Sequence, residues 1–451
     1  MAVSPARAVA FEILLRVERE ESYAAELLHS ARLAKLSSRD HGLATELAMG
    51  VLRWQSLLDR RLAAASSQKL ERLDGEVLAA LRLGVYQLQF LSRVPARAAI
   101  FESVELVKTA RKRSAAPFVN AVLRKIARAG AEDTFAEIGE SPDSMTLAQN
   151  AAHPPWLVAR WIEHYGLEAT RQICIQDQTV PDTAIHIHGD QSIADLASAG
   201  VQLSPGRLLS AARRILSGDV TGTRAYREGR ISIQDEASQL VALLVGRGEQ
   251  IVDCTILDCC AAPGSKTALL ARRNPRAKVF ATELHPHRAR LLQNLSRLPN
   301  VHVVAADARH LPFSLAFTFD RILADVPCSG TGTLARNPEI KWRLKAGDLH
   351  DLQLRQLAIL KSALAQLAIG GRFVYSTCSL EHEENEAVVE AALDGAAEFR
   401  VIDLKRDLEQ LRQSGEMCWK DIASLLAGPY LRTIPGVHPC DGFFAAMIER
   451  R

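Results

Sequence analysis

The chain has 451 residues, of which 48% are hydrophobic and 24% are charged. This length predicts two or three domains, and the composition is that of a folded globular protein and not of a disordered one. No apolar run approaches the roughly 18 residues of a membrane-spanning helix. Arg7, Glu12 and Arg16 interrupt the apolar start of the chain, which argues against a signal peptide. We therefore expect a cytoplasmic protein.

Charge and cysteine usage narrow the class further. The net charge is +3, but residues 1–130 contain 21 Lys and Arg against 13 Asp and Glu, so this part carries +8 and the remainder −5. A basic N-terminal module favours a polyanionic partner. The eight cysteines include the adjacent Cys259 and Cys260 but form no CxxC pair. We therefore expect reduced thiols, no disulfide scaffold and no bound metal.

Residues 5–130 have the pattern of helices throughout. Apolar side chains recur at intervals of three and four residues, and Ser37-Ser38-Arg39-Asp40 offers an N-cap. Because no alternating strand pattern interrupts them, the segment predicts an all-α bundle of about six short helices. The apolar series is clearest at Val77, Leu78, Leu81, Val85, Leu88 and Leu91.

The middle of the chain is mixed in composition. Residues 131–150 are polar and predict a linker. A helix is expected after His153-Pro154-Pro155, and short strands are expected near 184–188 and 229–233. We accordingly predict three domains, which are a helical domain over 1–135, a small α/β domain over 145–232 and a catalytic α/β domain over 233–451.

From about residue 235 onward, buried apolar strands alternate with helical stretches. This alternation predicts a parallel, doubly wound, Rossmann-like sheet, with one more strand at residues 442–448. The strands of the parallel sheet are expected at 255–259, 278–283, 301–305, 319–325 and 372–377.

The end of the first of these strands has the features of a ligand loop. A run of small residues follows Asp258 at the start of a helix, where the backbone can approach a ligand closely and exposed amides can bind polar groups. The spacing is neither GxGxxG nor GxxxxGK[ST], and a plain strand-to-helix turn would explain it about equally well. The candidate residues are Cys260, Ala261, Ala262, Pro263, Gly264, Ser265 and Lys266.

The next two strands end at acidic residues. Glu283, 25 residues beyond Asp258, stands where nucleotide-binding α/β folds grip the ribose hydroxyls, and Asp307 is suitably placed to touch an adenine amino group. Because ligands bind at the carboxyl ends of such strands, the three strand ends together favour an adenosyl-type cofactor.

Two cysteines mark the following strand ends. Cys328 follows Asp325 by three residues, and Cys378 lies fifty residues further on. Thiols at the edge where reactants bind are more often chemical than inert, because a thiolate is a strong nucleophile when its pKa is lowered. Lys266 and Lys341 are candidates to assist them.

A thiolate beside an adenosyl cofactor suits methylation of a pyrimidine at carbon 5. That carbon is a poor nucleophile until a thiolate adds to carbon 6, after which it can take a methyl group from S-adenosylmethionine. A base then removes the carbon 5 proton and the thiol is eliminated. An acid near the ring, such as Asp325, would help by hydrogen bonding to or protonating the ring edge. These residues therefore predict a pyrimidine carbon-5 methyltransferase.

Residues 234–385 resemble the RNA cytosine-C5 methyltransferases of the Sun/NSUN family. The resemblance implies that S-adenosylmethionine is the cofactor, that Cys378 is the nucleophile and that Cys328 acts in product release. It implies cofactor binding by 260–266, Glu283, Asp307 and Asp325. The matching motifs are Cys-Ala-Ala-Pro-Gly-Ser-Lys (260–266), Asp-Val-Pro-Cys-Ser-Gly-Thr-Gly (325–332), Asn-Pro-Glu-Ile-Lys-Trp (337–342), Ser-Thr-Cys-Ser (376–379) and Glu-Glu-Asn (383–385).

The N-terminal bundle resembles the NusB-like RNA-binding module, at residues 37–40, 50–53, 83–88 and 118–124. Joined to such a catalytic domain, it resembles the bacterial Sun (RsmB-type) enzymes, which implies methylation of a cytosine in 16S ribosomal RNA. The expected partner is therefore small-subunit ribosomal RNA, and the expected protein is a monomer. Candidate RNA contacts are Arg111, Lys112, Arg113 and Lys341.

Three features depart from the family pattern. Ile185-His186-Ile187-His188 stands where Arg-Val-Asn is common, and Ser265 replaces the more frequent second Gly of the cofactor loop. Residues 412–432 form a long approach to the last strand.

Two other functions stay open. A DNA cytosine-C5 methyltransferase would use the same addition chemistry with its nucleophile in the Pro-Cys motif, at Cys328. The Thr-Cys motif and the NusB-like module favour RNA. A non-catalytic RNA-binding ribosome assembly factor could retain the fold, but the intact Cys328, Cys378 and acidic strand ends argue against it.

Overall fold

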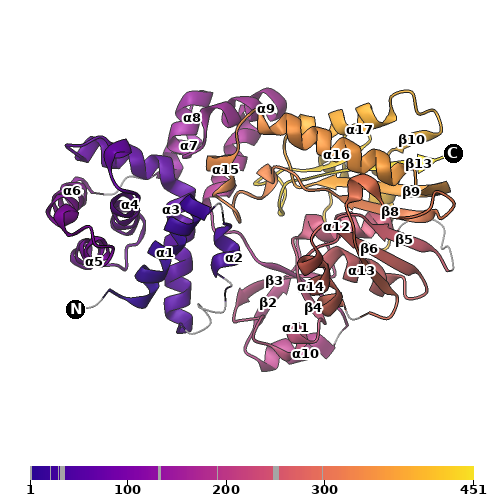
Figure 1. The fold of residues 1–451 in the computed structure, drawn as a ribbon, viewed down its shortest axis with the longest axis horizontal. Helices are drawn as coiled ribbons and strands as arrows, with labels where there is room; N and C mark the ends of the chain where they lie inside the picture. The colour runs from indigo at the N-terminus through magenta and orange to yellow at the C-terminus, as the bar shows by residue number, and fades with distance from the viewer. Residues whose placement is uncertain are drawn as a thin grey trace. The chain divides into compact units, whose positions relative to one another are not determined.

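The structure is a computed structural model that describes residues 3–20, 22–28, 30, 36–130, 134–189, 191–246, 253–296 and 298–451. The chain divides into two compact units (Figure 1). The first unit contains Met1–Val180 and Leu334–Leu344, and the second contains Pro181–Thr333 and Lys345–Arg451. None of the helices in the described residues is both long enough and apolar enough to cross a membrane.

The first unit is built on a bundle of helices, as the spacing of apolar residues predicts. The side chain of Ser37 caps the longest helix, α3, by accepting a hydrogen bond from the backbone N–H of Asp40. Trp54 of this helix stacks on Phe90 with ring centroids 5.0 Å apart. The elements are α1 (Pro5–Glu20), α2 (Ala24–Leu28), α3 (Ser38–Ala65), η2 (Leu70–Arg72), α4 (Gly75–Phe90), α5 (Ala96–Thr109), η3 (Arg113–Ala115) and α6 (Ala116–Ala129).

Residues 131–150, expected to be a linker, are helical over most of the part that the structure describes. The carboxylate of Asp143 accepts hydrogen bonds from the backbone N–H groups of Met145 and Thr146, so a polar residue of this segment serves as a helix cap. Both helices pack against the long helix that follows, within the first unit. The elements are α7 (Thr134–Gly139), α8 (Ser144–Asn150) and α9 (Pro155–Gln178).

A short segment from much later in the chain, Leu334–Leu344, also belongs to the first unit. It contains α15 (Ile340–Arg343), and its indole and guanidinium groups bond to the bundle. Trp342 Nε1 donates to the Leu52 carbonyl oxygen at 2.6 Å, and Arg343 donates to the Val17 carbonyl oxygen at 2.6 Å. The chain therefore passes between the two units three times. The sequence pattern gave no sign of this insertion.

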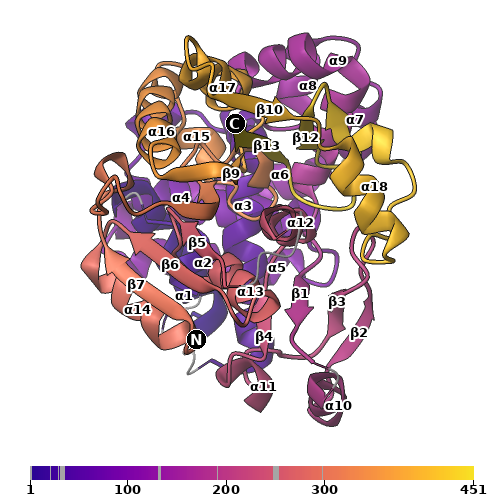
Figure 2. The ribbon, with the colours of Figure 1, turned by 90° about the vertical axis from the view of Figure 1, so that its right-hand side faces the viewer.

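The second unit begins with a small antiparallel sheet in the order β2-β3-β1-β4. The strands expected near 184–188 and 229–233 are β1 and β4, whereas the two strands between them were not predicted. Figure 2 shows this sheet beside α10 and α11. The elements are β1 (Ala184–Ile187), α10 (Gln191–Ser198), β2 (Gln202–Pro205), β3 (Ala212–Ser217), α11 (Arg224–Arg227) and β4 (Ile231–Ile233).

The main sheet of the second unit has the order β11-β12-β13-β9-β8-β5-β6-β7, with β10 paired to β13. Strands β5 to β9 pair in parallel, which confirms the predicted Rossmann-like sheet. The order reverses between β5 and β8, and folds of this kind bind ligands at the carboxyl ends of the strands beside such a reversal. The parallel strands are β5 (Thr255–Asp258), β6 (Lys278–Glu283), β7 (Val301–Ala305), β8 (Phe319–Asp325) and β9 (Leu367–Thr377).

Helices cover both faces of this sheet (Figure 1), because each buried strand carries apolar side chains on both sides. One face packs against α12 (Glu236–Val245), α13 (Ser265–Arg273) and α18 (Lys405–Gln413). The other packs against α16 (Asp348–Leu364) and α17 (Glu386–Leu393), while α14 (Pro286–Ser296) lies against β6 and β7.

The far edge of the sheet is antiparallel. The strand predicted at 442–448 is β13, and residues 412–432 supply a 3-10 helix and the edge strands that precede it. This accounts for the length of that segment. The elements are β10 (Phe399–Ile402), η7 (Ile422–Leu425), β11 (Leu426–Ala427), β12 (Tyr430–Thr433) and β13 (Phe443–Arg450), with η4 (Ala308–His310), η5 (Thr331–Thr333) and η6 (His382–Glu384) in earlier loops.

Candidate active site

The loop after β5 has a backbone that only glycine suits. Gly264 has φ +114°, and a Cβ there would lie 2.5 Å from Leu292 Cδ1. Ser265, which replaces a more usual glycine, begins α13 directly after it, and the Ala262–Pro263 peptide is cis. The loop therefore turns tightly from the carboxyl end of β5 into the start of a helix.

Acidic side chains gather around this loop. Burial raises the pKa of Cys260 well above its usual value, and four carboxyl groups add to the effect. Those groups are Asp258, Asp325, Glu283 and Asp307. The predicted acids thus lie at one edge of the sheet and make it anionic.

Three of these acids differ in their surroundings. Burial raises the pKa of Asp258 to about 6, although the Thr267 hydroxyl donates to its Oδ2 at 2.7 Å. Glu283 is buried and accepts a hydrogen bond from the backbone N–H of His285 at 2.9 Å. Asp307 lies nearer the surface, where Arg309 donates to its Oδ2 at 2.6 Å.

Lys266 and Asp325 form an ion pair at the junction of β5 and β8. Lys266 Nζ lies 2.5 Å from Asp325 Oδ2, and the Ser376 hydroxyl donates to Asp325 Oδ1 at 2.8 Å. Burial alone would lower the pKa of Lys266, but Asp325 outweighs it, so the pKa is raised and the ammonium stays charged. The same ammonium lies 5.4 Å from the ring centroid of Phe443 and interacts electrostatically with Cys378.

The two predicted cysteines lie side by side. Cys328 Sγ and Cys378 Sγ are 3.3 Å apart, and both residues are half-buried. The hydrogen bond to Cys378, together with burial, raises the pKa of Cys328 well above its usual value. Cys328 is therefore a thiol that keeps its proton while its sulfur lies beside that of Cys378.

A buried carboxylate joins the two cysteine loops. Glu384 Oε1 accepts hydrogen bonds from Ser329 N and Gln356 Nε2, both at 2.8 Å, and Oε2 accepts one from Ser379 Oγ at 2.5 Å. Glu384 is 0% exposed. Because Ser329 follows Cys328 and Ser379 follows Cys378, one side chain positions both sulfurs. We call these four residues, Glu384, Ser329, Gln356 and Ser379, the Glu384 clamp.

The sequence analysis assigned no function to the residues of the Glu384 clamp or to their neighbours. Glu384 lies in a family motif but received no role, and neither Gln356 nor Ser376 was singled out. A second buried pair supports the clamp, since Asn385 accepts from the Thr377 hydroxyl at 2.5 Å and donates to the Ser379 carbonyl oxygen at 3.0 Å. The sequence feature that could have indicated these roles is the Glu-Glu-Asn motif, which contains both the carboxylate of Glu384 and the amide of Asn385.

Lys341 was wrongly expected to contact RNA. Its side chain is 1% exposed and lies inside the first unit, where it interacts electrostatically with Asp177, Cys174 and Arg53. An ammonium so buried cannot reach a phosphate at the surface. The sequence does not show this burial, because a lysine is typical of a surface position.

The other candidate RNA contacts lie at the surface. Arg111 and Arg113 are exposed, and Lys112 forms an ion pair of 3.0 Å with Asp74. Arg111 has φ +62°, in the left-handed region. Their role in RNA binding stays a prediction.

The family departure at Ile185-His186-Ile187-His188 forms β1. His186 is buried and its Nδ1 lies 3.0 Å from Gln239 Oε1, while His188 Nε2 lies 3.3 Å from the Ser232 hydroxyl. These imidazoles bond within the second unit.

Comparison with known proteins follows the same division of the chain. The family profile of the 16S rRNA methyltransferases RsmB/F matches residues 249–449, and that of the NusB family matches residues 4–128. The sequence is 33% identical to the probable ribosomal RNA small subunit methyltransferase B of Bacillus subtilis, over 99% of this chain and 98% of that one. The chain belongs to the RsmB/F family.

Other similar proteins support the same family assignment. The ribosomal RNA small subunit methyltransferase B of Pseudomonas putida is 35% identical over 83% of this chain and 86% of that protein. Among solved structures, PH0851 matches over the whole of both chains with a TM-score of 0.79 and 21% identity. NSun6 from Pyrococcus horikoshii, solved with SFG, matches 65% of this chain and 97% of its own with a TM-score of 0.53 and 18% identity. These structures share the fold, and the predicted Sun-type family and NusB-like bundle are confirmed.

RsmB/F methyltransferases use S-adenosylmethionine, as predicted, and the residues at the sheet edge fit it. This cofactor is cationic at its sulfonium and ammonium groups, and the edge presents four carboxyl groups around the loop. Asp258 Oδ1, fully buried, has no hydrogen-bond partner among the described residues and can accept one. A ligand with cationic and donor groups therefore satisfies what this edge leaves unpaired.

Proposed function

We propose that this RsmB/F methyltransferase methylates carbon 5 of a cytosine in 16S ribosomal RNA through a covalent adduct with Cys378. The observation that carries the proposal is the pair of sulfurs, 3.3 Å apart, at the ends of adjacent parallel strands. The Lys266–Asp325 ion pair lies at the same strand ends. Together they supply a nucleophile, a second thiol and an ion pair that can bind the polar edge of a pyrimidine ring.

In the first step, the thiolate of Cys378 adds to carbon 6 of the ring. Lys266, which interacts electrostatically with this cysteine, stabilises the anionic sulfur. Negative charge then develops on the ring oxygen and ring nitrogen, where the Lys266 ammonium can donate a hydrogen bond. Asp325 can accept a hydrogen bond from the exocyclic amine, so the ion pair would orient the base.

When bound, S-adenosylmethionine would supply the methyl group that carbon 5, now enamine-like, takes up, and its S–CH₃ bond would break to leave S-adenosylhomocysteine. A base must afterwards remove the carbon 5 proton. The hydrogen bond to Cys378 is the largest cause of the raised pKa of Cys328. Once Cys378 is bonded to carbon 6 that hydrogen bond is lost, so Cys328 can release its proton to solvent and then serve as this base. The electrons of the broken C–H bond re-form the double bond between carbons 5 and 6, and the Cys378 sulfur leaves as thiolate. Cys328 thus acts late, in product release.

The test uses the order of these bonds. Cys378→Ala should abolish methyl transfer and any covalent RNA adduct. Cys328→Ala should still add and transfer the methyl group but release product slowly, so a protein–RNA complex should survive denaturing electrophoresis and require both Cys378 and the cofactor. Cys418→Ala removes an exposed cysteine outside the site and serves as the control.

Bisulfite sequencing of methylated 16S ribosomal RNA would locate the modified cytosine. An adduct trapped in Cys378→Ala and lost in Cys328→Ala would make Cys328 the nucleophile, as in DNA cytosine-C5 methyltransferases. Absence of methyl transfer by the wild-type protein to any RNA would favour the assembly-factor alternative.

A further inference from the structure

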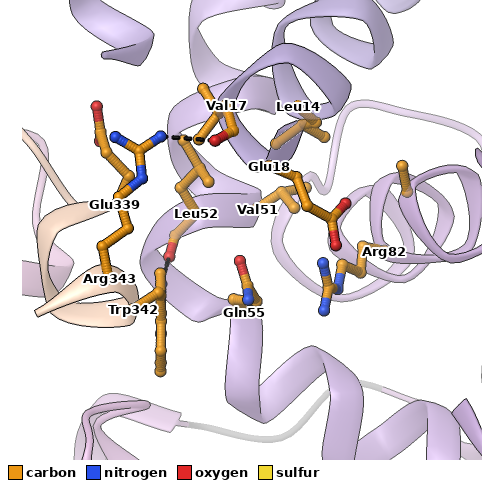
Figure 3. A pocket seen from close by; sticks show the side chains of 11 residues that line it. Leu14, Val17, Glu18, Val51, Leu52, Gln55, Arg82, Glu339, Trp342 and Arg343 are labelled. Carbon is orange, nitrogen blue, oxygen red and sulfur yellow. Dashed lines mark hydrogen bonds between the residues drawn. The ribbon is translucent and has the colours of Figure 1, made fainter. Parts of the chain in front are cut away.

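One family motif, residues 337–342, is not explained by the active site. It lies in the segment that joins the first unit, where Glu339, Trp342 and Arg343 line a pocket of about 240 Å³ (Figure 3). The other lining residues come from α1, α3 and α4, so the whole pocket lies within the first unit. We call it the Trp342 pocket.

The motif side of the pocket is held in place by the bundle. Trp342 Nε1 donates to the Leu52 carbonyl oxygen, and Arg343 donates to two backbone carbonyl oxygens of the first unit. Glu339 Oε1 accepts a hydrogen bond from the backbone N–H of Ala24 at 2.7 Å. A wall fixed by four hydrogen bonds costs a ligand little ordering entropy, which favours binding.

The size of the pocket restricts its ligand. Sites for drug-sized molecules measure roughly 300–1,000 Å³, and this one is smaller at about 240 Å³. It therefore suits a single ring system and not a whole nucleotide cofactor. The apolar side chains of Leu14, Val51 and Leu52 line the pocket, and such a ring can pack against them.

The polar groups of the pocket select against phosphate. Arg82 donates to both carboxylate oxygens of Asp59, at 2.7 and 2.8 Å, so its charge is already paired. Two carboxylates, Glu18 and Glu339, line the pocket and would repel an anion. A ligand that donates hydrogen bonds and brings no anionic group into the pocket therefore fits it.

Three side chains leave capacity for such a ligand. Within the described chain, Glu18 and Gln55 form no hydrogen bond or ion pair, and Glu339 Oε2, on a side chain 1% exposed, has no hydrogen-bond partner. Figure 3 shows Trp342 edge-on, with Gln55 and Glu18 on the same side of its ring. A planar ring stacked on Trp342 would thus face an amide and a carboxylate.

We propose that the Trp342 pocket binds one unstacked guanine of the RNA substrate. Unpaired bases of RNA are commonly bound by stacking on an aromatic side chain and by hydrogen bonds to their edges. Guanine offers ring N–H and amino donors to the Glu18 carboxylate and the N7 and O6 acceptors to the Gln55 amide. Adenine would instead turn a ring nitrogen lone pair toward the carboxylate. The proposal rests on RNA being the substrate but not on the carbon-5 chemistry.

The experiment measures binding of the full-length protein to labelled octauridine carrying one central guanosine, inosine or adenosine. The wild-type protein should prefer guanosine over adenosine by about tenfold, the discrimination expected of one bidentate contact, with inosine between them because it lacks the amino group. Glu18→Gln should remove this preference and leave adenosine binding unchanged. Glu71→Gln, which removes an exposed carboxylate elsewhere in the first unit, should keep it.

Stacking has its own readout. The guanosine oligonucleotide should quench tryptophan fluorescence in the wild-type protein, and Trp342→Phe should lose most of that quenching. Equal affinity for guanosine and adenosine in the wild-type protein would overturn the proposal, as would an unchanged preference in Glu18→Gln. Equal affinity would be expected if the pocket received a protein side chain, and an unchanged preference would place guanine recognition elsewhere. Because binding is measured without methyl transfer, a failure of the carbon-5 assignment would leave this result intact.

Discussion

Glu384→Gln should lower the free energy of unfolding of the second unit and slow catalysis, although glutamine has nearly the same shape as glutamate. The carboxylate accepts three hydrogen bonds in a fully buried site, from Ser329 N, Gln356 Nε2 and Ser379 Oγ. A glutamine can keep its oxygen toward the first two donors. Its NH₂ group then faces the Ser379 hydroxyl, which already accepts a hydrogen bond from Glu381 N at 3.0 Å.

The magnitude follows from these contacts. A hydrogen bond to a charged group contributes about 1.5–3 kcal/mol and one between neutral groups about 0.5–1.5 kcal/mol. The substitution removes one charge-assisted bond outright and reduces two others to neutral strength. We therefore expect the free energy of unfolding of the second unit to fall by about 3.5–6 kcal/mol.

The assay combines denaturant unfolding with single-turnover methylation. Because the clamp fixes the residues next to both cysteines, the rate of adduct formation in a Cys328→Ala background should fall about tenfold or more. Cofactor affinity should be unchanged. Glu390→Gln, an exposed carboxylate on α17, is the control. A loss of stability below about 0.5 kcal/mol would refute the energetic reasoning, and an unchanged adduct rate would show that the clamp does not position the sulfurs.

Three further outcomes are expected. Replacing Arg111, Lys112 and Arg113 by alanine should weaken RNA binding and reduce the slope of log affinity against log salt by about 0.7–0.9 for each phosphate that is no longer neutralised. An unchanged slope would exclude the cluster from RNA binding. Glu283→Gln should raise the dissociation constant for S-adenosylmethionine about tenfold or more by calorimetry, because charge-assisted bonds to the ribose are removed. Burial lowers the pKa of Lys341 to about 7, so between pH 7 and about 10 the unfolded chain holds more protons and the stability of the first unit rises with pH. Lys341→Met should abolish that rise and stabilise the first unit at pH 6.5, as measured by denaturant unfolding.

The strands that could be predicted from the sequence are those whose own residues show that the strand is buried. Phe319–Asp325 and Lys278–Glu283 were expected at their observed bounds because each contains three consecutive apolar residues, as strands covered on both faces do. These are residues 322–324 and 279–281. Leu426–Ala427 and Gln202–Pro205 are too short to show a period, and they exist because a neighbouring strand offers them hydrogen bonds. That neighbour is set by the fold and not by the local sequence.

The residues of the candidate active site also fall into those that could be predicted from the sequence and those that could not. The positions of Cys328, Cys378 and the acids followed from one rule, that carboxyl ends of parallel strands share an edge. The function of Glu384 did not follow, because it depends on which donors converge on a carboxylate after the chain has folded. Lys341 shows the converse error, since a lysine is exposed far more often than buried.

The insertion of Leu334–Leu344 into the first unit affects the time course of synthesis. Domains generally fold from the N-terminus as they leave the ribosome, at about 5–20 residues per second. The first unit, complete to Val180, must therefore wait roughly 10–30 s for its last segment. During that interval the buried Arg53 guanidinium lacks the Ala335 carbonyl oxygen to which it later donates at 2.9 Å. The last folding steps of the first unit therefore depend on prior synthesis of much of the second.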